Sequence, residues 1–228
     1  MLLHVPRVLT PDELAVMHAQ LAAAPWGDGK ATAGHQSVRV KENLQLPENS
    51  SEARELGAMV LRALERNGMF MSGALPALVY PPLFNRYEAG MNFGPHVDNA
   101  MRAVPGAGGR RIRTDVSATL FLTAPEDYDG GELIVEDTYG THSVKLPAGD
   151  LILYPATSLH RVAPVSRGAR VASFFWIQSM VKADAERQML FELDRSILDL
   201  AQSAPDSPTV LRLTALYHNL VRKWGEPR

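Results

Sequence analysis

The sequence predicts an α+β protein whose core is an antiparallel β-sandwich or jelly roll. Short apolar or alternating runs recur between residues 78 and 180, Gly, Pro, Asp and Asn separate them, and helical periodicity is confined to the flanking segments. Of the 228 residues, 46% are hydrophobic and 21% are charged, which permits a large core. We divide the chain into an N-terminal support (1–77), a jelly-roll core (78–180) and a C-terminal helical part (181–228).

Two helices are predicted before the strands. Thr10 and Glu13 have the spacing of a capping box, so a helix should run from here to about Ala24. A second helix is expected over residues 52–67, where apolar residues recur at helical spacing after an N-cap at Asn49. Both helices should pack on one sheet of the core.

The core is predicted from runs of five to eleven residues in which β-branched and aromatic side chains are frequent. No helical pattern falls between them, and antiparallel pairing is therefore favoured over a parallel sheet. The candidate strands are 83–88, 115–122, 131–137, 142–146, 150–155, 160–165 and 169–179.

Two amphipathic helices are predicted after the strands. The first covers residues 184–203, and Ser207-Pro208 can start the second, which continues to Trp224. They should form a hairpin that docks on the main domain or on a second subunit, so a homodimer through these helices is one expectation.

Composition excludes several classes of site. The chain has no cysteine, so disulfides, thiolate nucleophiles and cysteine-bound metals are excluded, and a metal must be held by N and O ligands. A net charge of −2 gives no general reason to expect nucleic acid as the main partner. No leader and no apolar run long enough to span a membrane is recognisable, so a cytoplasmic location is expected.

His96 and Asp98, in the stretch GPHVDNAMR, are the first candidate metal ligands. They lie two residues apart after a strand-like run, and such residues point to the same side of an extended chain. A motif this short is not specific by itself. A facial triad for non-haem Fe(II) needs one more histidine from another strand and leaves three coordination positions open.

Three later histidines are candidates for the third ligand. His218 falls in the predicted helical hairpin and His142 near a tight turn, whereas His160 opens a strand. His160 is therefore the predicted ligand. No ligand role is assigned to His4, His18, His35 or His218.

The strand after His160 supplies a candidate anion-binding residue. If residues 166–168 form a hairpin turn, Phe174 pairs with His160, and Arg170 shares their face, roughly 13 Å along the strand. A small dicarboxylate chelated to the metal could bridge that gap, because the planar fork of arginine binds a carboxylate through two parallel hydrogen bonds.

With these residues in place, the chain resembles a known family. RYEAGMNFGPHVDNAMR, YDGGELIVED and YPATSLHRVAPVSRGARVASFFWIQSM are similar to segments of the bacterial PKHD-type hydroxylases, which are relatives of prolyl and lysyl hydroxylases. The resemblance covers nearly the whole chain, from WGDGKATAG to the helical tail. It implies a double-stranded β-helix (jelly roll) with supporting N-terminal helices and a C-terminal helical hairpin.

The resemblance also implies a reaction and roles for particular residues. It implies an Fe(II)- and 2-oxoglutarate-dependent dioxygenase that hydroxylates its substrate with O₂ and releases succinate and CO₂, with ascorbate (vitamin C) as a possible reductant. His96, Asp98 and His160 would bind the iron, and Arg170 would bind the distal carboxylate of 2-oxoglutarate. Tyr87 matches a tyrosine that related hydroxylases place beside the cosubstrate.

A glycine-containing loop, residues 99–115, follows the first two candidate ligands. Long loops in compact domains are often functional, and we expect this one to be a mobile lid that helps to select an acidic or metal-chelating substrate. Solvated loop charges are the competing interpretation. Its basic residues are Arg102, Arg110, Arg111 and Arg113.

Two other functions compete with a hydroxylase. A non-catalytic iron-sensing jelly roll would use the same triad but would not need Arg170. A nucleobase dealkylase would use the same iron chemistry, and the acidic charge balance makes nucleic acid an unlikely partner. The substrate, a small molecule such as a siderophore or a peptidyl side chain, is not specified by the motif.

Overall fold

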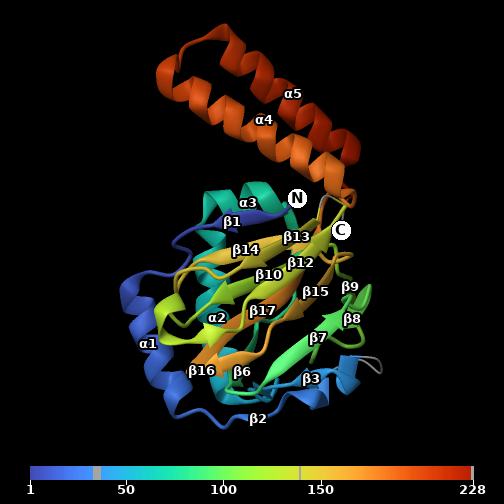
Figure 1. The fold of residues 1–228 in the computed structure, drawn as a ribbon. Helices are drawn as coiled ribbons and strands as arrows, with labels where there is room; N and C mark the ends of the chain where they lie inside the picture. Colours follow the sequence, from blue (N-terminus) through green and yellow to red (C-terminus); the bar gives the residue numbers. More distant parts are fainter. Residues whose placement is uncertain (33–36, 139, 227–228) are drawn as a thin grey trace.

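The computed structural model describes residues 1–32, 37–138 and 140–226, so His35 lies outside the described residues. Two antiparallel sheets face each other in the core, as Figure 1 shows. The larger sheet has the order β1-β14-β10-β17-β6-β4-β2, with β5 paired to β17, and the smaller has the order β13-β12-β15-β7-β3. The predicted α+β jelly roll is confirmed.

Most strands of the core belong to one of these two sheets. The larger sheet contains β1 (Leu3–Val5), β2 (Gly27–Asp28), β4 (Leu44–Gln45), β5 (Pro76–Val79), β6 (Leu83–Glu88), β10 (Val116–Phe121), β14 (Leu151–Pro155) and β17 (Ala169–Ser179). The smaller contains β3 (Lys41–Glu42), β7 (Asn92–His96), β12 (Leu133–Asp137), β13 (Gly140–Val144) and β15 (Leu159–Val162). Two short pairs join β8 (Met101–Ala103) to β9 (Arg111–Arg113) and β11 (Asp129–Gly130) to β16 (Val165–Arg167).

Both faces of the larger sheet are covered. Strand β10 shows this, because its alternate side chains pack into two different cores. Ala118 and Leu120 pack into a core with the helices α1 (Pro11–Ala22), α2 (Ser51–Glu65) and α3 (Gly68–Ala74). Phe121, on the opposite face, packs with residues of the smaller sheet. Side chains of a strand alternate between faces, so β10 lies between a helical layer and the second sheet.

The N-terminal helices begin where local capping is satisfied. The predicted capping box is present, with the Thr10 hydroxyl accepting from the Glu13 backbone and the Glu13 carboxylate accepting from the Thr10 backbone. The predicted cap of α2 at Asn49 is wrong, because the side chain of Ser50 accepts from the Ala53 amide at 3.1 Å. Helix α3 is too short for a periodic signal, and the sequence did not predict it.

The predicted hairpin between residues 160 and 174 is also wrong. His160 on β15 lies opposite Val135 and His96, while Phe174 on β17 lies opposite Thr119 and Leu83. The chain crosses from the smaller sheet to the larger one between these strands, with β16 paired to β11 on the way. His160 and residues of β17 thus face each other across the sandwich instead of sharing one sheet.

The C-terminal helices α4 (Asp184–Ser203) and α5 (Pro208–Trp224) form the predicted hairpin and project from the core in Figure 1. The chain enters and leaves the hairpin at one place, where Val181 forms a bridge with Gly225 and the Glu226 amide donates to the Met180 carbonyl. Homodimer formation stays a prediction. Apolar side chains exposed on the two helices are Met189, Leu198, Leu211 and Leu216. Among the described residues, no helix is long and apolar enough to cross a membrane.

Candidate metal centre and its pocket

The structure brings together the three predicted metal ligands. His96 ends β7, Asp98 follows two residues later, and His160 lies on β15 directly opposite His96. Their ligand atoms all lie within 4.8 Å of one another, and Asp98 Oδ2 is 3.7 Å from His160 Nε2. Two imidazoles and one carboxylate on one side of a common point fit the facial triad of a non-haem Fe(II) site.

Each of these side chains is oriented by a hydrogen bond. His96 Nδ1 donates to the Gly94 carbonyl at 2.8 Å, and His160 Nδ1 donates to the Ser158 carbonyl at 3.0 Å. Both rings therefore present Nε2 to the centre. The Ser117 hydroxyl, on β10 of the opposite sheet, donates to Asp98 Oδ2 at 2.6 Å and fixes the carboxylate.

The electrostatic environment keeps His96 neutral. Burial, with a smaller contribution from neighbouring His160, lowers the pKa of His96 to about 4. A metal binds the unprotonated nitrogen, so His96 needs to lose no proton at neutral pH before it can act as a ligand. The ring of Phe93 stacks on His96 with centroids 3.6 Å apart and limits its rotation.

Arg170 lies in the same cavity, on the opposite sheet. It is 1% exposed, and its Nε and Nη1 are buried without a hydrogen-bond partner among the described residues. A buried guanidinium left unpaired is costly, and a carboxylate is the ligand that its geometry suits best. The orphaned donors therefore fit the distal carboxylate of a small dicarboxylate.

Tyr87 is the direct cross-strand neighbour of Arg170, on β6. The Arg170 Cζ lies 5.4 Å from the centroid of the Tyr87 ring, and Tyr87 is 1% exposed. Burial raises the pKa of Tyr87 to about 12, so its hydroxyl keeps its proton and can donate a hydrogen bond at neutral pH. Tyr87 thus lies beside Arg170, and its position next to the cosubstrate stays a prediction.

The cavity lies between the two sheets and spans about 760 Å³ of empty space, part of it open to solvent. Of the four arginines predicted at its mouth, Arg102 lines it, whereas Arg110 and Arg111 are exposed and are not among its described lining residues. Part of the loop forms the β8–β9 hairpin. Its movement stays a prediction.

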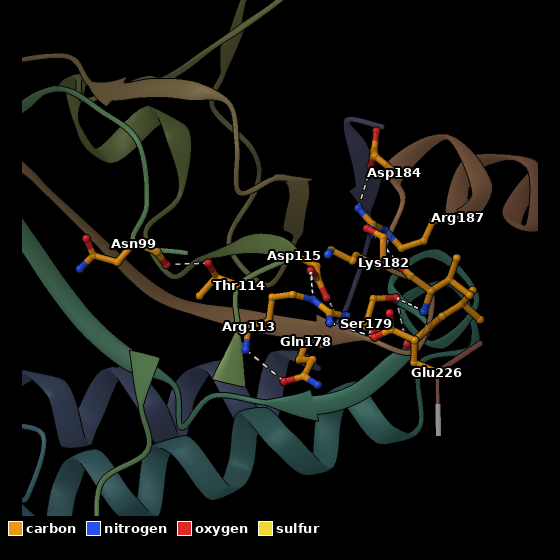
Figure 2. Close-up of polar contacts among 12 residues, drawn as sticks. Asn99, Arg113, Thr114, Asp115, Gln178, Ser179, Lys182, Asp184, Arg187 and Glu226 are labelled. Carbon is orange, nitrogen blue, oxygen red and sulfur yellow. Dashed lines mark hydrogen bonds and ion pairs between the residues drawn. The ribbon is translucent and has the colours of Figure 1, made fainter. Parts of the chain in front are cut away.

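Arg113 points to the base of the C-terminal helices, as Figure 2 shows. Its Nε donates to Asp115 at 2.7 Å and its Nη1 donates to Glu226 at 2.9 Å. Next to it, the Thr114 hydroxyl donates to the Asn99 carbonyl at 2.6 Å and ties the segment after Asp98 to β9. We therefore assign Arg113 to the attachment of the chain's C-terminal part and not to the pocket.

Sequence reasoning missed Lys41, which lines the cavity from β3 and is 3% exposed. Its strand is two residues long and about fifty residues before the first metal-ligand candidate, so neither periodicity nor motif spacing marked it. Burial, with a smaller contribution from the charge of Arg102, lowers the pKa of Lys41 to about 8 from 10.5.

This shift predicts a pH-dependent stability. Between pH 8 and 10.5 the unfolded chain holds the Lys41 proton that the folded chain has lost, so the free energy of unfolding should rise with pH in that window. The gain should approach about 3 kcal/mol. Urea unfolding of wild type and Lys41→Met at pH values through this window should show wild type gaining stability relative to the variant; parallel pH profiles would contradict it.

The fold and the site together define an oxygenase. Residues 82–178 match the 2OG-Fe(II) oxygenase superfamily, whose members use Fe(II) and 2-oxoglutarate, and the His96, Asp98 and His160 triad fits iron binding. Residues 184–226 match the PKHD-type hydroxylase C-terminal domain. A PKHD-type hydroxylase of Gluconobacter oxydans is 61% identical over 227 residues, which cover 99% of this chain and all of that protein. The chain belongs to the PKHD-type hydroxylases and is an oxidoreductase.

Solved structures of low sequence identity share the fold. A prolyl-4-hydroxylase of Pseudomonas putida superposes with a TM-score of 0.52 at 19% identity, covering 78% of this chain and 92% of that one. A prolyl hydroxylase from Trichoplax adhaerens, in complex with a hypoxia inducible factor peptide fragment, superposes with a TM-score of 0.55 at 15% identity, covering 83% and 86%. At such identity the likeness describes the fold alone.

Proposed function

We propose that the chain hydroxylates its substrate at an iron held by His96, Asp98 and His160, with 2-oxoglutarate anchored by Arg170 and converted to succinate and CO₂. One observation carries the proposal: the triad and the unpaired guanidinium of Arg170 line the same cavity. An iron sensor without turnover has no use for a buried carboxylate anchor, so Arg170 favours the enzyme.

Iron and 2-oxoglutarate, when bound, supply the oxidant that inserts one oxygen atom of O₂ into a C–H bond. The chain's residues position and neutralise these groups. Asp98 contributes the anionic ligand, and Ser117 holds it by a hydrogen bond across the sandwich. Arg170 offsets the distal carboxylate charge, and Tyr87 offers a hydroxyl proton beside it.

Water exclusion is the other contribution of the pocket. Phe121 and Tyr87 are 0–1% exposed, and their rings lie 5.2 and 5.4 Å from the Arg170 Cζ. An anion bound there meets few competing water molecules, so its hydrogen bonds to Arg170 are stronger than at a surface. This chemistry does not require the protein to supply a general acid or a nucleophile. A cytoplasmic location and the use of ascorbate stay predictions.

The test is spectroscopic. We expect protein purified without oxygen to show a visible metal-to-ligand charge-transfer band when Fe(II) and 2-oxoglutarate are added together, and His160→Ala to lose it, because chelation of the keto acid needs the iron in place. Exposure to O₂ should then yield succinate. His142→Ala, a change on the exposed β12–β13 hairpin, is the matched control and should keep the band. Iron binding without a band would favour the iron sensor.

A further inference from the structure

Residues 113–117 link the C-terminal helices to the proposed metal centre. Two of their side chains bind the root of the C-terminal helices, which we define as residues 178–181 together with Glu226, and Figure 2 shows these contacts. Two other side chains bind the segment that begins with the proposed iron ligand Asp98. A displacement of this short stretch would therefore reach both the helices and the metal centre.

Glu226 is the contact that the C-terminal part itself makes with this stretch. Its carboxylate accepts from Arg113 Nη1 at 2.9 Å, and its amide donates to the Met180 carbonyl at 2.8 Å. The side chains of Arg113 and Glu226 are 24% and 53% exposed. The end of the helical part is thus tied to β9 by a partly exposed ion pair, whose strength depends on how firmly Arg113 is held.

Asp115 is the buried group that holds Arg113. Its side chain is 6% exposed, and its two carboxylate oxygens accept from Arg113 Nε at 2.7 Å and from the Ser179 amide at 2.9 Å. Its own amide donates to the Ile177 carbonyl at 3.0 Å. A buried carboxylate needs such donors to offset its lost hydration, so Asp115 fixes the guanidinium of Arg113 relative to the end of β17.

The contacts on the metal side of the stretch are equally short. The Thr114 hydroxyl donates to the Asn99 carbonyl at 2.6 Å, and the Thr114 amide donates to the Ala100 carbonyl at 3.0 Å. The Ser117 hydroxyl donates to Asp98 Oδ2 at 2.6 Å. Three consecutive residues that start at the proposed ligand are held in this way, so the orientation of the Asp98 carboxylate depends on where the stretch lies.

We propose that Glu226 and Arg113 are positioning residues of the metal centre: the C-terminal helices hold residues 113–117, and this stretch holds Asp98 in the orientation in which it binds iron. The inference rests on the proposed function, since it assumes iron at the triad. It differs from simple attachment of the helices. Attachment alone would change the free energy of unfolding and leave the affinity of the folded protein for iron unchanged.

Two substitutions weaken the link at different places. Glu226→Gln keeps the shape of the side chain and removes the charge that pairs with Arg113, and it should raise the dissociation constant of Fe(II) about three- to fivefold. Asp115→Asn replaces one of the two buried acceptor oxygens with a donor and should raise it about tenfold. Competition with a weak chelator in the absence of oxygen measures the constant, and urea unfolding of the same proteins measures stability.

Controls separate positioning from attachment. Glu192→Gln removes the same charge from an exposed position on α4, where the carboxylate accepts from Gln188 of the same helix, and it should bind iron as wild type does. Glu226→Asp keeps the charge and should bind iron within about twofold of wild type.

A double substitution tests the route to Asp98. Thr114→Val keeps the shape of the side chain and removes the hydrogen bond to Asn99. In Thr114→Val protein, the added change Glu226→Gln should weaken iron binding less than it does in wild type, because two changes in one chain of contacts are not additive. Full additivity would overturn the route.

The outcomes distinguish this inference from the proposed function. A wild type that binds no iron refutes the proposed function and, with it, the inference. A Glu226→Gln protein with wild-type affinity for iron overturns the inference and leaves the oxygenase standing, whatever Asp115→Asn does, because Glu226 is the contact from the helices. Since Glu226 is 53% exposed, this decisive variant should fold even where Asp115→Asn does not.

Discussion

Replacing Arg170 with methionine should raise the dissociation constant of 2-oxoglutarate by about 100-fold or more, because two charge-assisted hydrogen bonds are lost. The same change should make the protein without cosubstrate more stable, by about 1–2 kcal/mol. Its guanidinium is 1% exposed with two unpaired nitrogens, and an apolar chain of similar length removes that cost. Titration of the charge-transfer band and urea unfolding measure the two effects.

Arg167→Met is the control for this substitution. Arg167 lies three residues earlier, is 57% exposed and pairs with Asp129 at the surface, so its loss should change stability little and cosubstrate binding not at all. An Arg170→Met protein that keeps wild-type affinity for 2-oxoglutarate would remove Arg170 from the proposed site.

The second large effect concerns iron. Asp98→Ala should lower the affinity for Fe(II) by at least about 100-fold, because the proposed site loses its one anionic ligand and keeps only the two histidines. Ser117→Ala should have a smaller effect, about tenfold, since it leaves the ligand but removes the 2.6 Å hydrogen bond that orients it. Metal content after anaerobic dialysis against a weak chelator measures both.

Asp199→Ala removes a carboxylate that is 71% exposed on α4 and should leave iron binding unchanged. Equal iron content in wild type and Asp98→Ala would contradict the assignment of the triad. The ranking of the three variants by iron content is also informative. If Asp98 only supported the local structure, Ser117→Ala and Asp98→Ala would lower the iron content equally.

Local signals explain what was predictable from the sequence. The bounds of α4 and α5 agree with the prediction because long amphipathic patterns end at clear breaks, and the Thr10 capping box is readable in four residues. The central strands β10 and β17 were predicted because each is a long run rich in apolar and β-branched residues. The short strands β2, β3 and β4 contain two residues each and carry no periodic signal.

The pairing between strands that are distant in the sequence could not be predicted from such local patterns. His160 and Arg170 were predicted to share a cavity through a hairpin, whereas they lie on facing sheets that the chain links by a crossover. Neighbours in sequence suggest a hairpin, but the choice between a hairpin and a crossover depends on which sheet buries each strand. Lys41 was missed because only the pairing of β3 with β7 brings it to the cavity.

The placement of the site across two sheets has a consequence for the whole molecule. The proposed iron ligands His96 and His160 belong to the smaller sheet, and the proposed carboxylate anchor Arg170 belongs to the larger one. A chelated cosubstrate therefore fastens the two sheets together through the middle of the sandwich. At a concentration 100 times its dissociation constant it would add about 2.7 kcal/mol to the stability of the fold. The cell's supply of a metabolite would then help to determine how long the enzyme itself stays folded.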